Sequence, residues 1–388
     1  LGDAVAAAGT GARAVSVSLK DRAAILPLGR AGTPIWYDRK AVAWTSTAPV
    51  PWLAAHTAAH PIAPRLATPW TPLDAGRLAQ LTGTTDDAAG EVGEKGFGPT
   101  FPHSLQATKQ PAIAVFAAPL GNTLVLETGL AAIAGAGLGT DEVPDLLVVS
   151  LSAHDYAAHG WGHESWELWD MTLRLDDELA RFLAGLDTRV GAGEWAMIVT
   201  SDHGGSPLAA RLAGGQITHE QVAEAANRAA STQLGPGAWI AAAKFPTLYL
   251  SAAARAKPRE LDKVVTKIVH ALRALPGIAR VERTADLAGH CERRTGEDRV
   301  ICLALDPVAS GEVVYLPKRG WSFVAAHDPV ATSHGSLHDY DREVPVILLP
   351  PGRTPHPALT APSGRLPMTR IAPLVAEWLG VPAPATLR

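Results

Sequence analysis

Three histidines and three acids are crowded into one short stretch of the sequence, "VVSLSAHDYAAHGWGHESWE" (148–167). The apolar residues at its start predict a buried strand. Asp155 and His159 lie four residues apart, so a helical turn would aim a carboxylate and an imidazole at one ion. His154 and His163 do not fit a repeated ligand spacing, and we expect them at the rim. The stretch therefore predicts two ligands of a metal ion.

Two further groups of ligand-type residues occur later in the chain. Thr200-Ser-Asp-His-Gly204 contains the adjacent residues Asp202 and His203, which a glycine-relieved turn can direct to one point. Thr332-Ser-His-Gly-Ser336 contains His334. Either group alone could be an ordinary polar turn. All three groups, however, lie at the edges of predicted strands, where open α/β sheets build their sites, and together they predict a metal site.

A pair of basic residues follows an apolar segment near the start of the chain. In "AVSVSLKDRAAIL" (14–26), polar and apolar residues alternate, so Lys20 and Arg22 are predicted to share one face of a strand. An ammonium group beside a planar guanidinium suits the oxygens of a phosphoryl group. On spacing alone, a solvated basic edge is the alternative.

The elements that must position these residues form an α/β pattern. Strands are predicted at 12–20, 145–152, 194–201 and 343–350 from their β-branched and apolar content. Between the second and third strands, apolar residues recur at helical steps over 165–186, which predicts an amphipathic helix packed on a sheet. Strand, long helix and strand in this order indicate a unit of a parallel sheet.

The segment 205–300 has helices and a strand of its own, so we expect an inserted α+β subdomain within a single domain over 1–388. A helix is predicted over 368–380, ended by a glycine. The regions 50–75 and 86–110 are rich in proline, glycine, threonine and histidine, and loops are expected there.

Composition excludes several classes of protein. Apolar residues make up 47% and charged residues 19% of 388 residues, which excludes general disorder. A formal net charge of −4 argues against a nucleic-acid-binding surface, and no apolar run approaches the length of a membrane span. The first residues lack the features of a signal peptide and are typical of the interior of a domain, so we expect that the natural start is missing.

Taken together, "DYAAH…GH", "SDHGG", "SHGS…YDREVPV" and "VSLKDRAAILPLG" resemble motifs of the alkaline phosphatase superfamily. Within it, they are most similar to the bacterial periplasmic phosphatases related to type I phosphodiesterase/nucleotide pyrophosphatases. The resemblance implies an alkaline-phosphatase-like sandwich, with a mostly parallel central sheet and helices on both faces. It also implies a periplasmic or secreted protein whose partners are small phosphate esters. Cys291 and Cys302, with ten residues between them, could then form a disulfide or remain free thiols.

The resemblance further implies a site with two zinc ions. Asp155, His159 and His334 match the ligands of one zinc, and Asp202 and His203 match two ligands of the other. Lys20 and Arg22 match the pair that binds phosphoryl oxygens in the monoesterase branch. On ligand type alone, Mn²⁺ and Fe²⁺ remain open.

The family places its Thr or Ser nucleophile, an Asn and a further zinc-binding Asp upstream of the point that corresponds to Leu1. The leading hypothesis is a two-zinc hydrolase of phosphate monoesters that forms a covalent phospho-enzyme, with a nucleophile upstream of this chain. A phosphodiesterase or nucleotide pyrophosphatase on the same scaffold is one alternative. A non-catalytic zinc- or phosphate-binding fragment is another.

Overall fold

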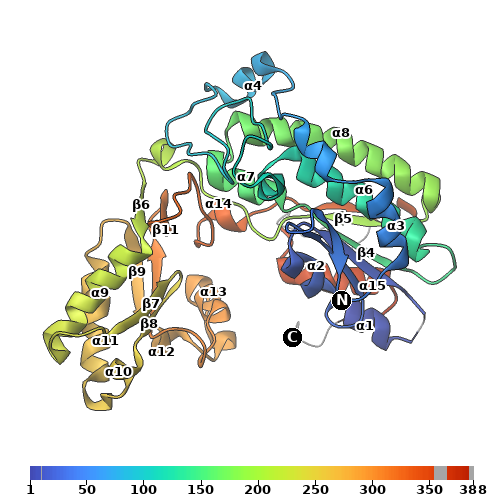
Figure 1. Ribbon diagram of the computed structural model, residues 1–388. Coiled ribbons are helices and arrows are strands. Elements are labelled where there is room, and N and C mark those ends of the chain that lie inside the picture. The colour runs from blue at the N-terminus through green and yellow to red at the C-terminus, as the bar shows by residue number, and fades with distance from the viewer. Residues whose placement is uncertain (10, 354–364, 384–388) are drawn as a thin grey trace.

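The computed structural model describes residues 1–9, 11–353 and 365–383 and confirms the predicted α/β fold (Figure 1). The first sheet has the strand order β3-β2-β1-β4. Its central strand, β1 (Ala14–Ser18), runs parallel to β2 (Thr33–Asp38) and to β4 (Leu146–Ser150), whereas β3 (Ala43–Ser46) is antiparallel to β2. The predicted strands at 12–20 and 145–152 are thus neighbours.

Helices cover both faces of this sheet. The core cluster that contains Val15 and Val17 also includes apolar residues of α6 (Pro119–Ala136) and α8 (Trp166–Arg189). A second cluster joins Leu28 of α2 (Asp21–Leu28) and Leu146 of β4 to α1 (Gly2–Ala7) and α15 (Ile371–Trp378). Helix α8 confirms the amphipathic helix predicted between the second and third strands.

The expected polar face of β1 is wrong, because this strand is buried on both sides. Ser16 and Ser18 are as buried as Val17. Their hydroxyl groups are satisfied inside the protein: Ser16 Oγ donates to the carbonyl of Ala24 at 2.6 Å, and Ser18 Oγ lies 3.3 Å from Ser152 Oγ. When helices cover both faces of a sheet, alternating polar and apolar residues in a strand do not identify a face that is exposed to water.

Strand β5 (Met197–Val199) pairs antiparallel with β12 (Ile347–Leu349), and both lie within predicted strands. β4 pairs with β1 rather than with β5. The expected strand–helix–strand order is therefore present, but among the described residues no backbone ladder joins β4 to β5.

A second lobe follows the first (Figure 1). It contains an antiparallel sheet with the order β7-β8-β10-β9 and a parallel pair of β6 and β11. β10 and β11, which complete these sheets, lie beyond residue 300. The predicted limits of the inserted subdomain, 205–300, therefore stay a prediction. The strands are β6 (Gly215–Thr218), β7 (Ile240–Lys244), β8 (Thr247–Leu250), β9 (Ile278–Arg283), β10 (Val313–Pro317) and β11 (Trp321–Val324). The helices are α9 (His219–Leu234), α10 (Ala252–Arg255), α11 (Pro258–Arg273), α12 (Thr284–Leu287) and α13 (Gly296–Ala304).

Helices α9 and α11 line the core of the second lobe. Cys291 and Cys302 form a disulfide in this lobe, so the bridged alternative is confirmed.

The expectation of loops over 50–75 is wrong, because α3 (Pro51–Ala59) and a 3₁₀ helix (Ala63–Ala67) lie there. Proline at a first helical position is compatible with a helix start, which explains why a proline-rich stretch can be helical. The remaining α-helices are α4 (Ala75–Thr82), α5 (Pro111–Ala114), α7 (Ala153–Trp161) and α14 (Asp339–Arg342). Further 3₁₀ turns span Val115–Ala117, Ala209–Leu212, Cys291–Arg293, Pro351–Arg353 and Met368–Arg370.

Among the described residues, no helix alone has the length and apolar character needed to cross a membrane. Only Pro111–Ala117 and Pro119–Ala136, taken together and bent by 85°, meet that test by length and composition.

Candidate metal centre

The first two predicted ligands lie on α7, which follows β4 almost immediately. Asp155 Oδ1 is 3.4 Å from His159 Nε2, as the four-residue spacing predicts for a helical turn. His159 Nδ1 lies 2.9 Å from the carbonyl oxygen of Thr332. A proton on Nδ1 satisfies that bond, so Nε2 is the ring nitrogen that could ligate a metal ion once it has given up its own proton.

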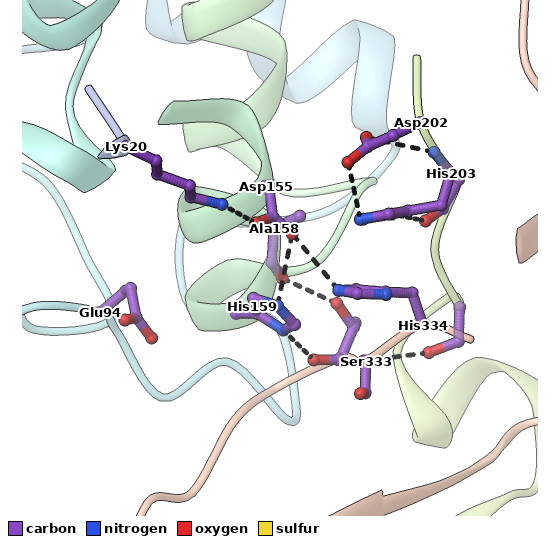
Figure 2. Close-up of polar contacts among 12 residues, drawn as sticks. Lys20, Glu94, Asp155, Ala158, His159, Asp202, His203, Ser333 and His334 are labelled. Carbon is purple, nitrogen blue, oxygen red and sulfur yellow. Dashed lines mark hydrogen bonds and ion pairs between the residues drawn. The ribbon is translucent and has the colours of Figure 1, made fainter. Parts of the chain in front are cut away.

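His334 reaches the same carboxylate from a segment more than 170 residues later in the chain. Its Nε2 atom lies 3.5 Å from Asp155 Oδ1. The segment is fastened to α7, because Thr332 Oγ1 donates to the carbonyl of Ala158 at 2.8 Å. Figure 2 shows Lys20, His159 and His334 around Asp155.

His203 joins this group from the loop after β5. Its ring stacks on that of His334, with the centroids 3.6 Å apart and the planes 15° apart. The loop is fixed by Gly204, whose N–H donates to the carbonyl of Asp341 at 2.9 Å. A Cβ at Gly204 would collide with the Tyr340 carbonyl oxygen, so this close approach requires glycine.

Asp202 differs from the other predicted ligands. Its side chain is 86% exposed, and its Oδ2 atom lies 3.6 Å from His203 Nε2. It is near the other four residues but is not enclosed with them.

Asp155, His203 and His334 each offer one ligand atom within 4.8 Å of the others. Within the described ranges of the chain, no other group of three or more His, Cys, Asp or Glu residues meets this criterion. Imidazole nitrogen and carboxylate oxygen are both zinc ligands, so the donor set fits a zinc ion.

The two basic residues have different surroundings. Lys20 Nζ lies 2.7 Å from Asp155 Oδ2, which places this ammonium group at the centre. Arg22 does not share a strand face with Lys20, because β1 ends at Ser18 and Arg22 belongs to the first turn of α2. Arg22 is exposed, and its guanidinium makes no hydrogen bond or ion pair to any residue that the structure describes.

The electrostatics of Asp155 favour a cation. Burial opposes the charge of this carboxyl group, but hydrogen bonds from His159, His334 and Lys20 hold its pKa well below the usual range. The carboxylate is therefore ionised at neutral pH and available to bind a metal ion.

The two histidines expected at the rim differ in exposure: His154 is half-buried, whereas His163 is exposed. His154 Nδ1 lies 3.2 Å from Asn122 Nδ2, and burial lowers the pKa of His154 to about 4. His163 packs against Gly205, where an added Cβ would strike its ring, and partial desolvation together with the charge of His159 lowers its pKa.

A loop that borders the centre, residues 93–96 ("GEKG"), was not predicted to be part of the site. Its Lys95 Nζ lies 4.8 Å from the centroid of the Tyr156 ring, and Lys20 Nζ lies 4.5 Å from the same centroid. Glycines on both sides of a Glu-Lys pair were the only signal in the sequence.

Comparisons with known proteins identify the family to which the chain belongs. Residues 31–341 match the family described as type I phosphodiesterase / nucleotide pyrophosphatase. The chain is 29% identical over 396 residues to alkaline phosphatase PafA of Elizabethkingia meningoseptica, covering 96% of this chain and 69% of the relative. It is 28% identical over 396 residues to a calcium-transporting ATPase of Myroides odoratus, covering 96% and 70%. Alkaline phosphatase PhoD of Zymomonas mobilis is 26% identical over 412 residues, covering 98% and 67%.

Solved structures give the same result. The crystal structure of wild-type PafA matches with a TM-score of 0.85 at 27% identity, over 100% of this chain and 75% of that one. A PafA mutant matches with a TM-score of 0.83 at 26% identity, with the same coverage. In this mutant a threonine is replaced by serine, and an asparagine, a lysine and an arginine are each replaced by alanine. The lysine and the arginine lie two positions apart.

Proposed function

Because the chain belongs to the type I phosphodiesterase / nucleotide pyrophosphatase family, we propose that it is a zinc-dependent hydrolase of phosphate monoesters. The observation that carries the proposal is the convergence of Asp155, His203 and His334, with Lys20 on the opposite carboxylate oxygen of Asp155. The similarity to alkaline phosphatases PafA and PhoD supports the same reaction class.

The five predicted ligands would hold two zinc ions. One ion would be bound by Asp155, His159 and His334, and the other by Asp202 and His203. Zinc bound there would offset the charge of the attacking and leaving oxygens during in-line displacement at phosphorus. We also propose a covalent phospho-enzyme, with a Thr or Ser nucleophile that we assign to no residue of this chain.

Lys20 and Arg22 would bind the non-bridging phosphoryl oxygens, whose negative charge persists through a loose transition state. Their spacing equals that of the lysine and arginine replaced in the PafA mutant. Lys20 is already at the centre, and the exposed Arg22 side chain lies two residues further along the chain. A Lys/Arg pair prefers a monoester dianion to a diester, which carries one charge less at phosphorus.

We also propose a location for the protein and a class of substrates. The disulfide between Cys291 and Cys302 supports a periplasmic or secreted protein, and the similarity to alkaline phosphatase PafA supports small phosphate esters as its substrates.

A metal analysis combined with an assay of p-nitrophenyl phosphate hydrolysis tests the proposal on the protein that includes the upstream residues expected to supply the nucleophile. We expect bound zinc, hydrolysis that a chelator abolishes, and a loss of about 100-fold or more in His334→Ala. The exposed His270 on α11 provides the control, and His270→Ala should retain the wild-type rate. Zinc binding without turnover in that longer protein would instead favour a non-catalytic zinc- or phosphate-binding module, whereas the same result for residues 1–388 alone is equally expected of a fragment without its nucleophile.

A further inference from the structure

The loop 93–96 is attached directly to α7. The backbone N–H groups of Val92 and Gly93 both donate to the carbonyl of Gly160, at 2.9 and 3.1 Å. A Cβ at Gly160 would lie 2.5 Å from Glu94 Cβ, so the helix and the loop can approach this closely only at a glycine. The loop is therefore held against the helix that carries the first two predicted zinc ligands.

This attachment brings a second ammonium group to the Tyr156 ring. The Nζ atoms of Lys95 and Lys20 lie 4.8 and 4.5 Å from its centroid, and Tyr156 directly follows Asp155. Lys95 has a φ of 52°, a left-handed conformation that residues with a Cβ rarely adopt. Such conformations persist where the surrounding structure fixes them, often at functional sites.

The charges around the two lysines are nearly balanced in pairs. Lys20 is paired with Asp155, and Lys95 forms an ion pair with Glu94, whose side chain is 7% exposed. Figure 2 shows Glu94 and Lys20 on the side of the centre away from His203. The Lys95 side chain is 27% exposed and that of Lys20 13%, so Lys95 is the more accessible of the two.

An ammonium group has three N–H donors, and each lysine is engaged by one carboxylate, Asp155 or Glu94, so both can still donate to a bound anion with two charged groups. We propose that Lys95, which packs with Lys20 on the Tyr156 ring, forms a second anion subsite beside the position of the transferred phosphoryl group. The inference rests on the proposed function, which places that phosphoryl group at Lys20. A substrate with two linked phosphates would occupy both lysines, whereas a monophosphate with a neutral leaving group would use Lys20 alone.

Isothermal titration calorimetry on the zinc-loaded full chain tests the subsite, with inorganic phosphate and methylenediphosphonate as probes. Zinc content is measured after each titration, because diphosphonates can chelate the metal. We expect Lys95→Met to weaken diphosphonate binding about tenfold, the effect of losing one charge-assisted contact, and phosphate binding less than twofold. Lys95→Arg should restore diphosphonate binding, and Lys20→Met should weaken both anions.

Lys109 is an exposed lysine in the same region, and Lys109→Met should change neither affinity. If Lys95→Met weakens both anions equally, or neither, the subsite is wrong while Lys20-dependent phosphate binding still supports the proposed function. If the zinc-loaded wild-type chain does not bind phosphate, the proposed function and the subsite both fail.

Discussion

Asp155 is the residue around which the other polar groups of the centre are arranged. It contacts His159 within its own helix, His334 from a distant loop and Lys20 from the end of β1. The contact to His159 could be predicted from sequence, because a four-residue spacing has one geometry in a helix. The exposure of Asp202 could not, since the direction of adjacent side chains in an irregular loop depends on contacts made by other segments.

At the residue scale, Lys20 and Arg22 should set the preference between monoesters and diesters. We expect the double variant Lys20→Ala/Arg22→Ala to lose kcat/KM for p-nitrophenyl phosphate at least tenfold more than for bis-p-nitrophenyl phosphate, because the dianion needs more positive charge. The exposed Lys40 offers a control, and Lys40→Ala should leave the ratio of the two rates unchanged. Equal losses on both substrates would support the phosphodiesterase alternative.

At the element scale, the short helix α14 joins the two loops that carry histidine ligands. The buried carboxylate of Asp341 accepts from the Ser336 N–H at 2.7 Å, in the loop of His334. The carbonyl of the same residue accepts from Gly204, in the loop of His203. One residue therefore holds both loops, which explains how two histidines so distant in sequence can stack.

Replacing this carboxylate should loosen the His334 loop. We expect Asp341→Ala to lower the free energy of unfolding by about 2 kcal/mol, because the buried Ser336 N–H loses its acceptor. Zinc affinity should fall about tenfold to 100-fold, as for other groups that orient metal ligands. Urea denaturation and competitive zinc titration measure the two effects. Asp339→Ala, an exposed change in the same helix, is the control, and an unchanged zinc affinity in Asp341→Ala would contradict the role.

At the scale of the whole molecule, the second lobe lies, along the sequence, between the segments that supply the ligands. The chain leaves the first lobe after His203 and supplies His334 only after β11. Apolar strands and amphipathic helices made both lobes recognisable from sequence. The antiparallel pairing of β5 with β12 was not, because it joins segments almost 150 residues apart through backbone hydrogen bonds that no side-chain pattern records.

Zinc should therefore stabilise the molecule as a whole. A ligand that binds only the folded chain raises the free energy of unfolding by about 2.7 kcal/mol at 100 times its Kd, so the melting temperature should rise by several degrees. Differential scanning calorimetry with zinc and then with excess chelator measures the shift and its reversal. The shift should shrink in His334→Ala and persist in His270→Ala. The same melting temperature with and without zinc would contradict a site that ties these segments together.

The late position of His334 also sets the order of events during synthesis. A ribosome translates Asp155, His159 and His203 more than a hundred codons before His334. Until that interval has passed, the centre lacks one of its side chains. The complete set of side chains can therefore bind an ion only after the second lobe has been synthesised.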